Sequence, residues 1–271
     1  IFDAMHPSLP SEGFISGSYS PDLDYKKKAS DAIVGVLKKH YERLFISYQA
    51  FGAAFLFKMP SQNSELGIHQ DWTIVDEEKF VALNCWIPLT DVNEFNGALS
   101  VIPGSHYPAY RTMRAPTAPF FFSGNEDALI PHAIPMNVKA GEAVILNQSV
   151  IHYSPPNRSN KIRKAITAGI KSAGAPMRFH YKLPNSDQLE VFDMPEDFLI
   201  SFDDFYKDIF ERPKMGTSIG VINYTNPTLS RTEAIELILT LKTKAGCDKR
   251  KDVLPAIEHK SFFKRLAEVF K

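Results

Sequence analysis

A histidine and an aspartate lie two positions apart in the segment His69-Gln70-Asp71. Because alternate residues of a β-strand point to the same face, an extended backbone would place the imidazole and the carboxylate side by side, with Gln70 directed away. Two histidines and one carboxylate on one face of an octahedron hold non-haem iron(II) and leave the other positions open. The pattern therefore predicts two ligands of such a metal site and requires a second histidine elsewhere in the chain.

The most suitable second histidine is His152, which follows the apolar segment AVILNQSVI and precedes a Pro-Pro turn, with Arg163 at the start of the next predicted strand. A 2-oxoglutarate cosubstrate would chelate iron through its keto-acid end and leave its far carboxylate for a guanidinium with forked donors. In that strand, alternate residues lie on opposite faces. Ala165, Thr167 and Gly169 share the face of the arginine, and Ile166, Ala168 and Ile170 lie on the reverse face. We therefore expect a ligand pocket on the first face and helix packing on the second.

The composition indicates one globular domain. The chain has 271 residues, 44% of them apolar, which is enough for one good-sized core and predicts a single domain over residues 1–271. The 31 basic and 31 acidic side chains balance, so no overall field favours a nucleic acid or an anionic membrane as partner. Cys85 and Cys247 lie in unlike contexts and predict neither a disulfide framework nor a zinc cluster.

The sequence carries no sign of a membrane span or of export. No apolar run approaches the ~18 residues that a spanning helix requires, and the first residues, IFDAMHPSLP, lack the regions of a signal peptide. We therefore expect a cytoplasmic protein. Because the sequence begins at Ile, it can be a piece of a longer polypeptide, and its oligomeric state is not predicted.

Many short apolar segments are separated by Gly- and Pro-containing turns, which is typical of a β-sandwich or barrel. The predicted strands lie at residues 45–59, 80–87, 98–102, 143–146 and 163–170, with 149–153 leading into the polar cluster around His152. Residues 107–137 form a long insert of low regularity, and the stretch 172–228 is mixed in character. Inserts of this kind in compact domains are often lids or binding loops, so we expect these two to enclose the substrate.

Helices are expected on either side of the strands. Residues 1–28 have the Pro and Gly content of a loop-rich arm, and Ser30 can cap a helix whose apolar stripe is Ile33, Val36, Leu37, Tyr41 and Leu44. The segment Ser230–Glu233 has the form of a capping box and predicts a helix that ends near Gly246. A last amphipathic helix is predicted to carry Phe263, Leu266, Ala267 and Phe270.

These motifs resemble those of the phytanoyl-CoA dioxygenase family of Fe(II)/2-oxoglutarate oxygenases, which includes the ectoine hydroxylases. The matching pieces are His69-Gln70-Asp71, the segment from Trp86 to His106 with its WIPLTD, NG and IPGSH motifs, and HYSPPN from His152 followed by Arg163. The resemblance covers roughly residues 49–171. It implies a mainly β protein with flanking helices, a double-stranded β-helix (jelly roll, cupin-like) with its core at about 45–171 and helical and loop additions at both ends.

The resemblance also implies a site and an activity. Iron(II) would be held by His69, Asp71 and His152, and Arg163 would bind the far carboxylate of 2-oxoglutarate, with Ser154 and Trp86 lining that pocket. The expected reaction uses O2 to hydroxylate an unactivated C–H bond of a small organic substrate, with succinate and CO2 as coproducts; desaturation or cyclisation stay open. Halogenating members replace the carboxylate, so Asp71 favours oxygen insertion. The substrate itself is not predicted.

Two other functions remain open. A cupin-like isomerase or hydrolase could use the same three ligands with zinc or manganese and without 2-oxoglutarate, in which case Arg163 would bind the substrate. A non-catalytic jelly-roll binding module with a vestigial site is the third hypothesis. Its ligand set would be expected to have drifted, whereas all three ligands are intact here.

Several other residues admit a plainer interpretation. His106 is expected to pack at a turn, and Arg158, in the polar turn PPNRSN, to be solvated, while the aromatic run Phe120–Phe122 is interpreted as an apolar anchor for its insert. Basic side chains on surfaces usually meet only water. That is the expectation for Lys58, Arg111 and Arg114, although each could meet an anionic substrate group.

Overall fold

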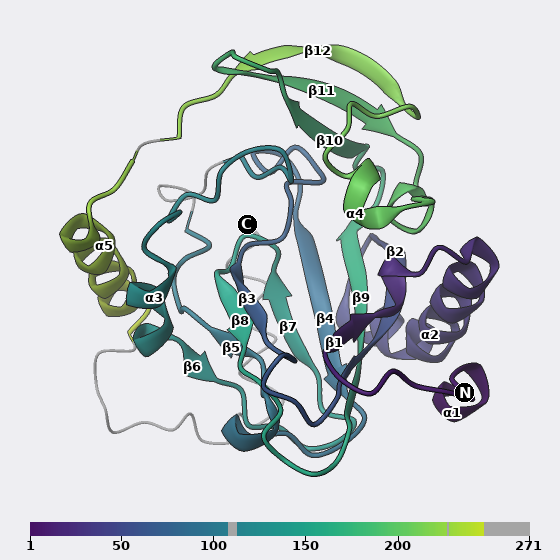
Figure 1. The fold of residues 1–271 in the computed structure, drawn as a ribbon. Helices are drawn as coiled ribbons and strands as arrows, with labels where there is room; N and C mark the ends of the chain where they lie inside the picture. Colours follow the sequence, from purple (N-terminus) through teal and green to yellow (C-terminus); the bar gives the residue numbers. More distant parts are fainter. Residues whose placement is uncertain (108–112, 227, 247–271) are drawn as a thin grey trace.

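The computed structural model describes residues 1–107, 113–226 and 228–246, and two β-sheets that face one another form its centre (Figure 1). The first sheet contains, in spatial order, β1 (Phe14–Ser16), β2 (Tyr48–Lys58), β9 (Arg163–Ser172), β4 (Ala82–Pro88) and β7 (Val144–Asn147). The second contains β3 (Leu66–His69), β8 (His152–Ser154), β5 (Ser100–Val101) and β6 (Ile134–Pro135). Every pairing within them is antiparallel.

The path of the chain between the two sheets identifies the fold. From β2 the chain passes to β3 in the second sheet, returns for β4, crosses again for β5 and β6, and returns for β7. It then crosses once more for β8 and ends the core with β9 beside β2. This alternation is the double-stranded β-helix, or jelly roll. The predicted fold class is confirmed, and the core strands span residues 48–172.

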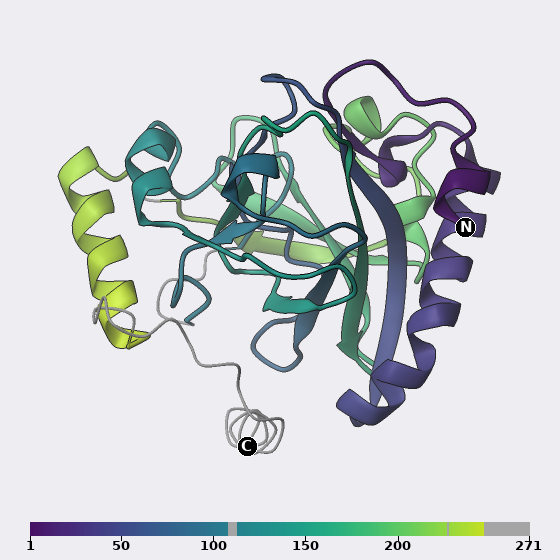
Figure 2. The same ribbon diagram turned by 90° about the horizontal axis from the view of Figure 1, so that it is seen from below.

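The helix α2 (Leu23–Leu44) covers the outer face of the first sheet beside β2 (Figure 2). It begins earlier than the sequence predicted, because Asp22 caps it by accepting the Tyr25 N–H at 2.9 Å. Ser30 lies inside the helix, where its hydroxyl accepts the Ala53 N–H at 3.1 Å. The β-bulge around Gly52 explains this bond, since it interrupts the pairing of β2 with β9.

The reverse face of β9 is packed as the alternation predicted. Its larger residues join the helix in one apolar cluster that includes Ile33, Leu37, Tyr41, Ile166, Ala168 and Ile170. The arm before α2 contains α1 (Phe2–Met5), β1 and the 3-10 turn η1 (Gly17–Tyr19), so it is more regular than predicted. Its strand pairs with β2 in the register Ile15↔Phe57. The arm therefore lies along the edge of the first sheet.

A third sheet, which the sequence analysis left unassigned, follows the core. It contains β10 (Met177–Lys182), β11 (Gln188–Met194) and β12 (Thr217–Asn223) in that order and lies across the top of Figure 1. Between β11 and β12 the chain forms η5 (Phe198–Ile200) and the short helix α4 (Phe205–Asp208). The apolar residues of these segments pack with Ile74 and Val75, which follow β3. They therefore close one end of the jelly roll.

The second sheet is flanked by helices, and α3 (Glu126–Leu129) and α5 (Arg231–Lys244) lie beside it on the side away from α2 (Figure 1). The 3-10 turn η2 (Glu94–Asn96) precedes β5, and α3 and η4 (Ile130–His132) precede β6. The predicted capping box opens α5, because Ser230 and Glu233 bond each other's backbone N–H. Phe122 is buried with Leu129 and α5, which confirms that this aromatic run anchors its insert.

Three further predictions concern the last helix, membrane-spanning segments and the extent of the domain. The last predicted helix, around residues 263–270, lies outside the described residues. Within the described part of the chain, no helix is long and apolar enough to cross a membrane. The extent of the domain, residues 1–271, stays a prediction.

Candidate active site

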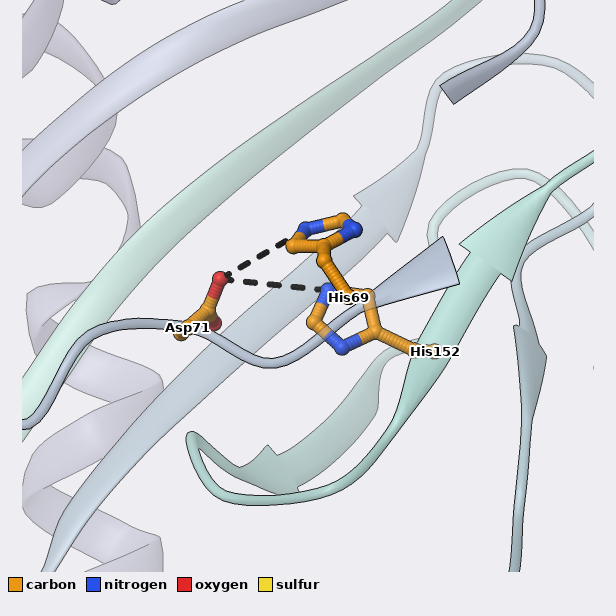
Figure 3. Close-up of side chains that lie close together, drawn as sticks. All are labelled: His69, Asp71 and His152. Atoms are coloured by element: carbon orange, nitrogen blue, oxygen red, sulfur yellow. Dashed lines mark ion pairs between the residues drawn. The ribbon is translucent and has the colours of Figure 1, made fainter. Parts of the chain in front are cut away.

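Two facing strands bring the two histidines together. His69 is the last residue of β3 and His152 the first of β8, and the two are paired in the antiparallel register. Asp71 lies beyond the end of β3, so the prediction of one strand through both His69 and Asp71 was wrong. The backbone there is instead held by the Asp71 N–H, which donates to the Gln148 carbonyl at 3.0 Å. The three side chains nevertheless converge (Figure 3).

The spacing of their polar atoms suits one metal ion. The Nε2 atoms of His69 and His152 lie 3.9 and 3.8 Å from Asp71 Oδ1, and one ligand atom from each residue lies within 4.8 Å of the others. Nitrogen and oxygen ligands bind divalent metals at about 2.0–2.2 Å, so ligand atoms on adjacent octahedral positions lie about 3 Å apart. Small side-chain movements would therefore give a metal-bound arrangement.

Hydrogen bonds to the backbone orient both imidazoles. His69 Nδ1 donates to the Gly67 carbonyl at 2.7 Å, and His152 Nδ1 donates to the Val150 carbonyl at 2.9 Å. A carbonyl can only accept, so the proton is on Nδ1 and the Nε2 lone pair faces the aspartate, as in metal-binding histidines. The Asn84 side-chain amide, on β4, donates to Asp71 Oδ2 at 3.1 Å. The other carboxylate oxygen, Oδ1, is the one that faces the histidines.

The charge state of His69 also suits a ligand. Displacement of solvent by the surrounding protein, and then the neighbouring His152, lower the pKa of its imidazole to about 4, although Asp71 acts in the opposite direction. The ring is therefore neutral near pH 7, with its lone pair available. The His69 and His152 ring centroids lie 4.3 Å apart, which explains why His152 disfavours protonation of His69.

Arg163 forms the inner end of the same cavity. It begins β9, is almost fully buried, and its guanidinium carbon lies 5.5 Å from the centre of the Trp86 ring. Its Nη2 is 3.5 Å from the Ser154 hydroxyl, and its Nε and Nη1 have no hydrogen-bond partner within the described residues. Burial lowers its pKa to about 9, so it remains a cation at neutral pH. A buried cation with unused donors is costly unless an anion binds it.

Lys58 was expected to be exposed, and this prediction was wrong. It is fully buried opposite Arg163 in the pairing of β2 with β9. Its amino group donates to the carbonyls of Ser154 and Pro155, both at 2.7 Å. Burial, and then the adjacent arginine, lower its pKa to about 6. Lys58 therefore holds β8, the strand that carries His152 and Ser154, in place. Its position at the end of an apolar segment did not indicate this role.

Arg114 is also buried, contrary to expectation. It forms an ion pair with Glu77, and its Nε donates to the Asp71 carbonyl at 2.7 Å. It therefore supports the backbone of a candidate ligand. Arg111 lies outside the described residues. Arg158 is exposed, as predicted for a solvated turn.

The cavity runs from Arg163 past the candidate metal ligands to the protein surface. Its lining includes the predicted residues His69, Asp71, His152, Arg163, Ser154 and Trp86. Thr167 and Gly169 line it from the arginine's face of β9, as the alternation predicted. Leu56, Leu99 and Leu146 close the inner part. Asn84, which the sequence analysis did not single out, lies between Asp71 and Thr167 and accepts a hydrogen bond from the threonine hydroxyl.

The fold and the convergent residues define a jelly-roll protein with two histidines and one carboxylate in a cavity that also contains a buried arginine. The family model for phytanoyl-CoA dioxygenase (PhyH) matches residues 23–165. The chain belongs to the phytanoyl-CoA dioxygenase family.

Curated relatives agree with this assignment. The chain is 32% identical over 126 residues to the mouse phytanoyl-CoA dioxygenase domain-containing protein 1, covering 44% of this chain and 43% of that protein. It is 32% identical over 156 residues to the Dictyostelium discoideum homologue, covering 54% and 52%. It is 30% identical over 115 residues to rice phytanoyl-CoA dioxygenase 1, covering 42% and 41%. The matched region thus spans about half the length of these relatives.

Among solved structures, the chain is similar to a non-haem α-ketoglutarate-dependent carbocyclase from nogalamycin biosynthesis. The TM-score is 0.46 at 18% sequence identity, covering 64% of this chain and 70% of that one.

Proposed function

We propose that this chain is an Fe(II)- and 2-oxoglutarate-dependent dioxygenase that hydroxylates an unactivated C–H bond of a small organic substrate, with succinate and CO2 as coproducts. One observation carries the proposal. Arg163 is a buried cation with unused donors, and it shares a cavity with two histidines and an aspartate whose ligand atoms face one another. A diacid that chelates a metal at one end and meets a guanidinium at the other would satisfy both features.

The donor set favours iron(II). Two imidazole nitrogens and one carboxylate oxygen, supplied by His69, His152 and Asp71, are the ligands of non-haem iron(II) oxygenases. When bound, iron and 2-oxoglutarate supply the oxidising power for attack on a C–H bond. The described residues that line the cavity around the ligands are otherwise apolar or hydrogen-bonding side chains, with Arg163 as the further charged group.

The protein's own residues would bind, orient and protect the reactants. Arg163 would bind the far carboxylate of 2-oxoglutarate, with its guanidinium kept in place by the Trp86 ring and the Ser154 hydroxyl. Asn84 would orient the Asp71 carboxylate. Leu56, Leu99 and Leu146 would exclude water from the inner part of the cavity. No side chain needs to act as a general acid or base.

Anaerobic spectroscopy tests this proposal. Protein mixed with Fe(II) and 2-oxoglutarate should show a weak visible charge-transfer band. The band should be lost in Asp71→Ala and weakened in Arg163→Ala. Arg158→Ala is the matched control, because this arginine is exposed and outside the cavity lining, and its band should be unchanged. Absence of a band in the unmutated protein would refute the proposal.

Two measurements separate the alternatives. Succinate formation only when O2 is supplied would distinguish the dioxygenase from a zinc- or manganese-dependent isomerase or hydrolase. Failure to take up iron after reconstitution would favour a non-catalytic binding module. Product analysis would separate hydroxylation from desaturation or cyclisation. The cytoplasmic location stays a prediction, which cell fractionation tests, and so does the absence of a nucleic-acid partner.

A further inference from the structure

The outer part of the cavity is an aromatic wall built by distant segments of the chain. Tyr19 comes from the N-terminal arm, Trp72 directly follows Asp71, and Phe205 begins α4. The Tyr19 and Phe205 rings stack with centroids 4.3 Å apart and planes 28° apart, and Phe205 and Trp72 lie 6.0 Å apart with planes 9° apart. We call these three residues the aromatic wall. The stacked rings cover part of one another's faces, and their edges and outer faces make this side of the cavity apolar and aromatic, next to the candidate ligand Asp71.

The cavity lining has little charge to offer a substrate. Among the described residues that line it, the ionisable groups are the three candidate ligands, Arg163 and the Tyr19 phenol. Burial, followed by nearby Tyr206 and Asp71, raises the pKa of that phenol to about 12, so it stays neutral. A charged substrate group would lose its hydration here without an opposite charge to replace it, which is unfavourable. The lining therefore favours an uncharged substrate.

One buried polar atom of the cavity lining lacks a hydrogen-bond donor within the described residues. The Gln148 side chain is 6% exposed, lines the cavity, and its Oε1 has no hydrogen-bond donor within the described residues. The backbone carbonyl of the same residue accepts the Asp71 N–H, so Gln148 lies next to a candidate metal ligand. The other glutamine of the lining, Gln70, has a partner within the protein, because its side-chain amide donates to the Ser149 carbonyl at 2.6 Å. A buried acceptor without a donor from the protein can take one from a ligand or from an ordered water, and in a substrate cavity the ligand would displace that water.

We propose that the substrate is an uncharged molecule with an apolar ring system that packs against the aromatic wall and a hydroxyl or N–H group that donates to Gln148 Oε1. This inference rests on the proposed dioxygenase function and specifies its substrate class. Free amino acids and other substrates with a charge near the reacting carbon are disfavoured. The hydrogen bond would select molecules that have a donor, since a site with an unpaired acceptor rejects analogues that lack one.

A matched set of probes tests the proposal by calorimetry on anaerobic protein loaded with Fe(II) and 2-oxoglutarate. The probes are 2-(2-naphthyl)ethanol, 2-naphthylacetate and 2-ethylnaphthalene, which share the ring system and differ in donor and charge. The alcohol should bind at least about tenfold more tightly than the carboxylate or the hydrocarbon. Equal or tighter binding of the carboxylate, or no binding of the alcohol at millimolar concentration, would overturn the proposal.

Variants assign the contacts. Gln148→Leu keeps the approximate volume and removes the acceptor, so it should weaken binding of the alcohol about tenfold and leave that of the hydrocarbon unchanged. Phe205→Ala should weaken both neutral probes, whereas Phe95→Ala, an exposed phenylalanine outside the cavity lining, should weaken neither. Equal losses for all probes in Gln148→Leu would contradict a specific hydrogen bond.

The charge-transfer band is also recorded on each sample before a probe is added. Absence of the band would refute the proposed dioxygenase function. A normal band together with the wrong probe selectivity would refute only the inference about the substrate.

Discussion

The inner and outer ends of the cavity are built in different ways. The inner end consists of core strands: β3 and β8 carry the two histidines, β9 carries Arg163, and β4 carries Trp86 and Asn84. The outer end consists of connecting segments: the arm before α2, the residues that follow β3, and those between β11 and β12. The jelly roll can therefore keep one reaction centre while the additions around it change the substrate.

The way in which the side chains are held differs as well. At the inner end, hydrogen bonds to the backbone orient each imidazole, and an amide orients the carboxylate. At the outer end, Tyr19 and Phe205 are held by ring stacking. Ring stacking constrains position less than directional hydrogen bonds do. We therefore expect substitutions at the inner end to abolish function and those at the outer end to change selectivity.

Loss of a candidate metal ligand should have the largest effect. Asp71→Ala removes the oxygen that both histidines face, so iron content and O2-dependent succinate formation should each fall by more than about a hundredfold, beyond the range seen when only a supporting group is lost. Iron analysis and succinate assays measure this. Glu78→Ala, an exposed carboxylate outside the cavity lining, is the control. Retention of iron by Asp71→Ala would contradict the assignment of Asp71 as a metal ligand at the inner end of the cavity.

Removal of the buried guanidinium should come next. Arg163→Ala should raise the KM for 2-oxoglutarate roughly a hundredfold, because loss of one partner of a buried charge pair costs about 3 kcal/mol. Iron content should be retained, since Arg163 is not one of the three candidate ligands. Phe205→Ala, at the outer end, should change this KM less than about twofold. A similar rise in both variants would mean that the two ends do not act separately.

The contact that orients the aspartate should have a smaller effect. Asn84→Ala removes the donor to Asp71 Oδ2, and loss of such a supporting group typically lowers metal affinity about 10- to 100-fold. Competition with a chelator measures the iron affinity. Asn63→Ala, an exposed asparagine outside the cavity lining, is the matched control. Unchanged affinity would show that the carboxylate needs no orientation by β4.

The two ends also differ in how far the sequence predicted them. The short strands predicted a β-sandwich or barrel, and the resemblance to the family implied the jelly roll. The motifs around His69, His152 and Arg163 predicted that these residues converge. The aromatic wall was not predicted, since Tyr19 and Phe205 are 186 positions apart in the numbering and meet only through the additions around the core. The third sheet was missed for a related reason: β12 is exposed along its whole length and lacks the alternation of a half-buried strand.

Lys58 gives the smallest and most specific effect, a dependence of stability on pH. Burial lowers the pKa of the folded-state amino group to about 6 from the ordinary lysine value of 10.5, so between these values the unfolded chain binds one more proton than the folded protein. Raising the pH therefore favours folding. Relative to Lys58→Met, the native protein should gain about 1 kcal/mol of unfolding free energy per pH unit between about pH 7 and 9, the order expected for one proton. Denaturant unfolding of both proteins at several pH values measures this.

The exposed Lys27→Met variant should follow the native profile, because its ammonium remains in solvent. A parallel course for native protein and Lys58→Met would show that the lysine is solvated, and the inner end would then be less rigidly built than its hydrogen bonds indicate.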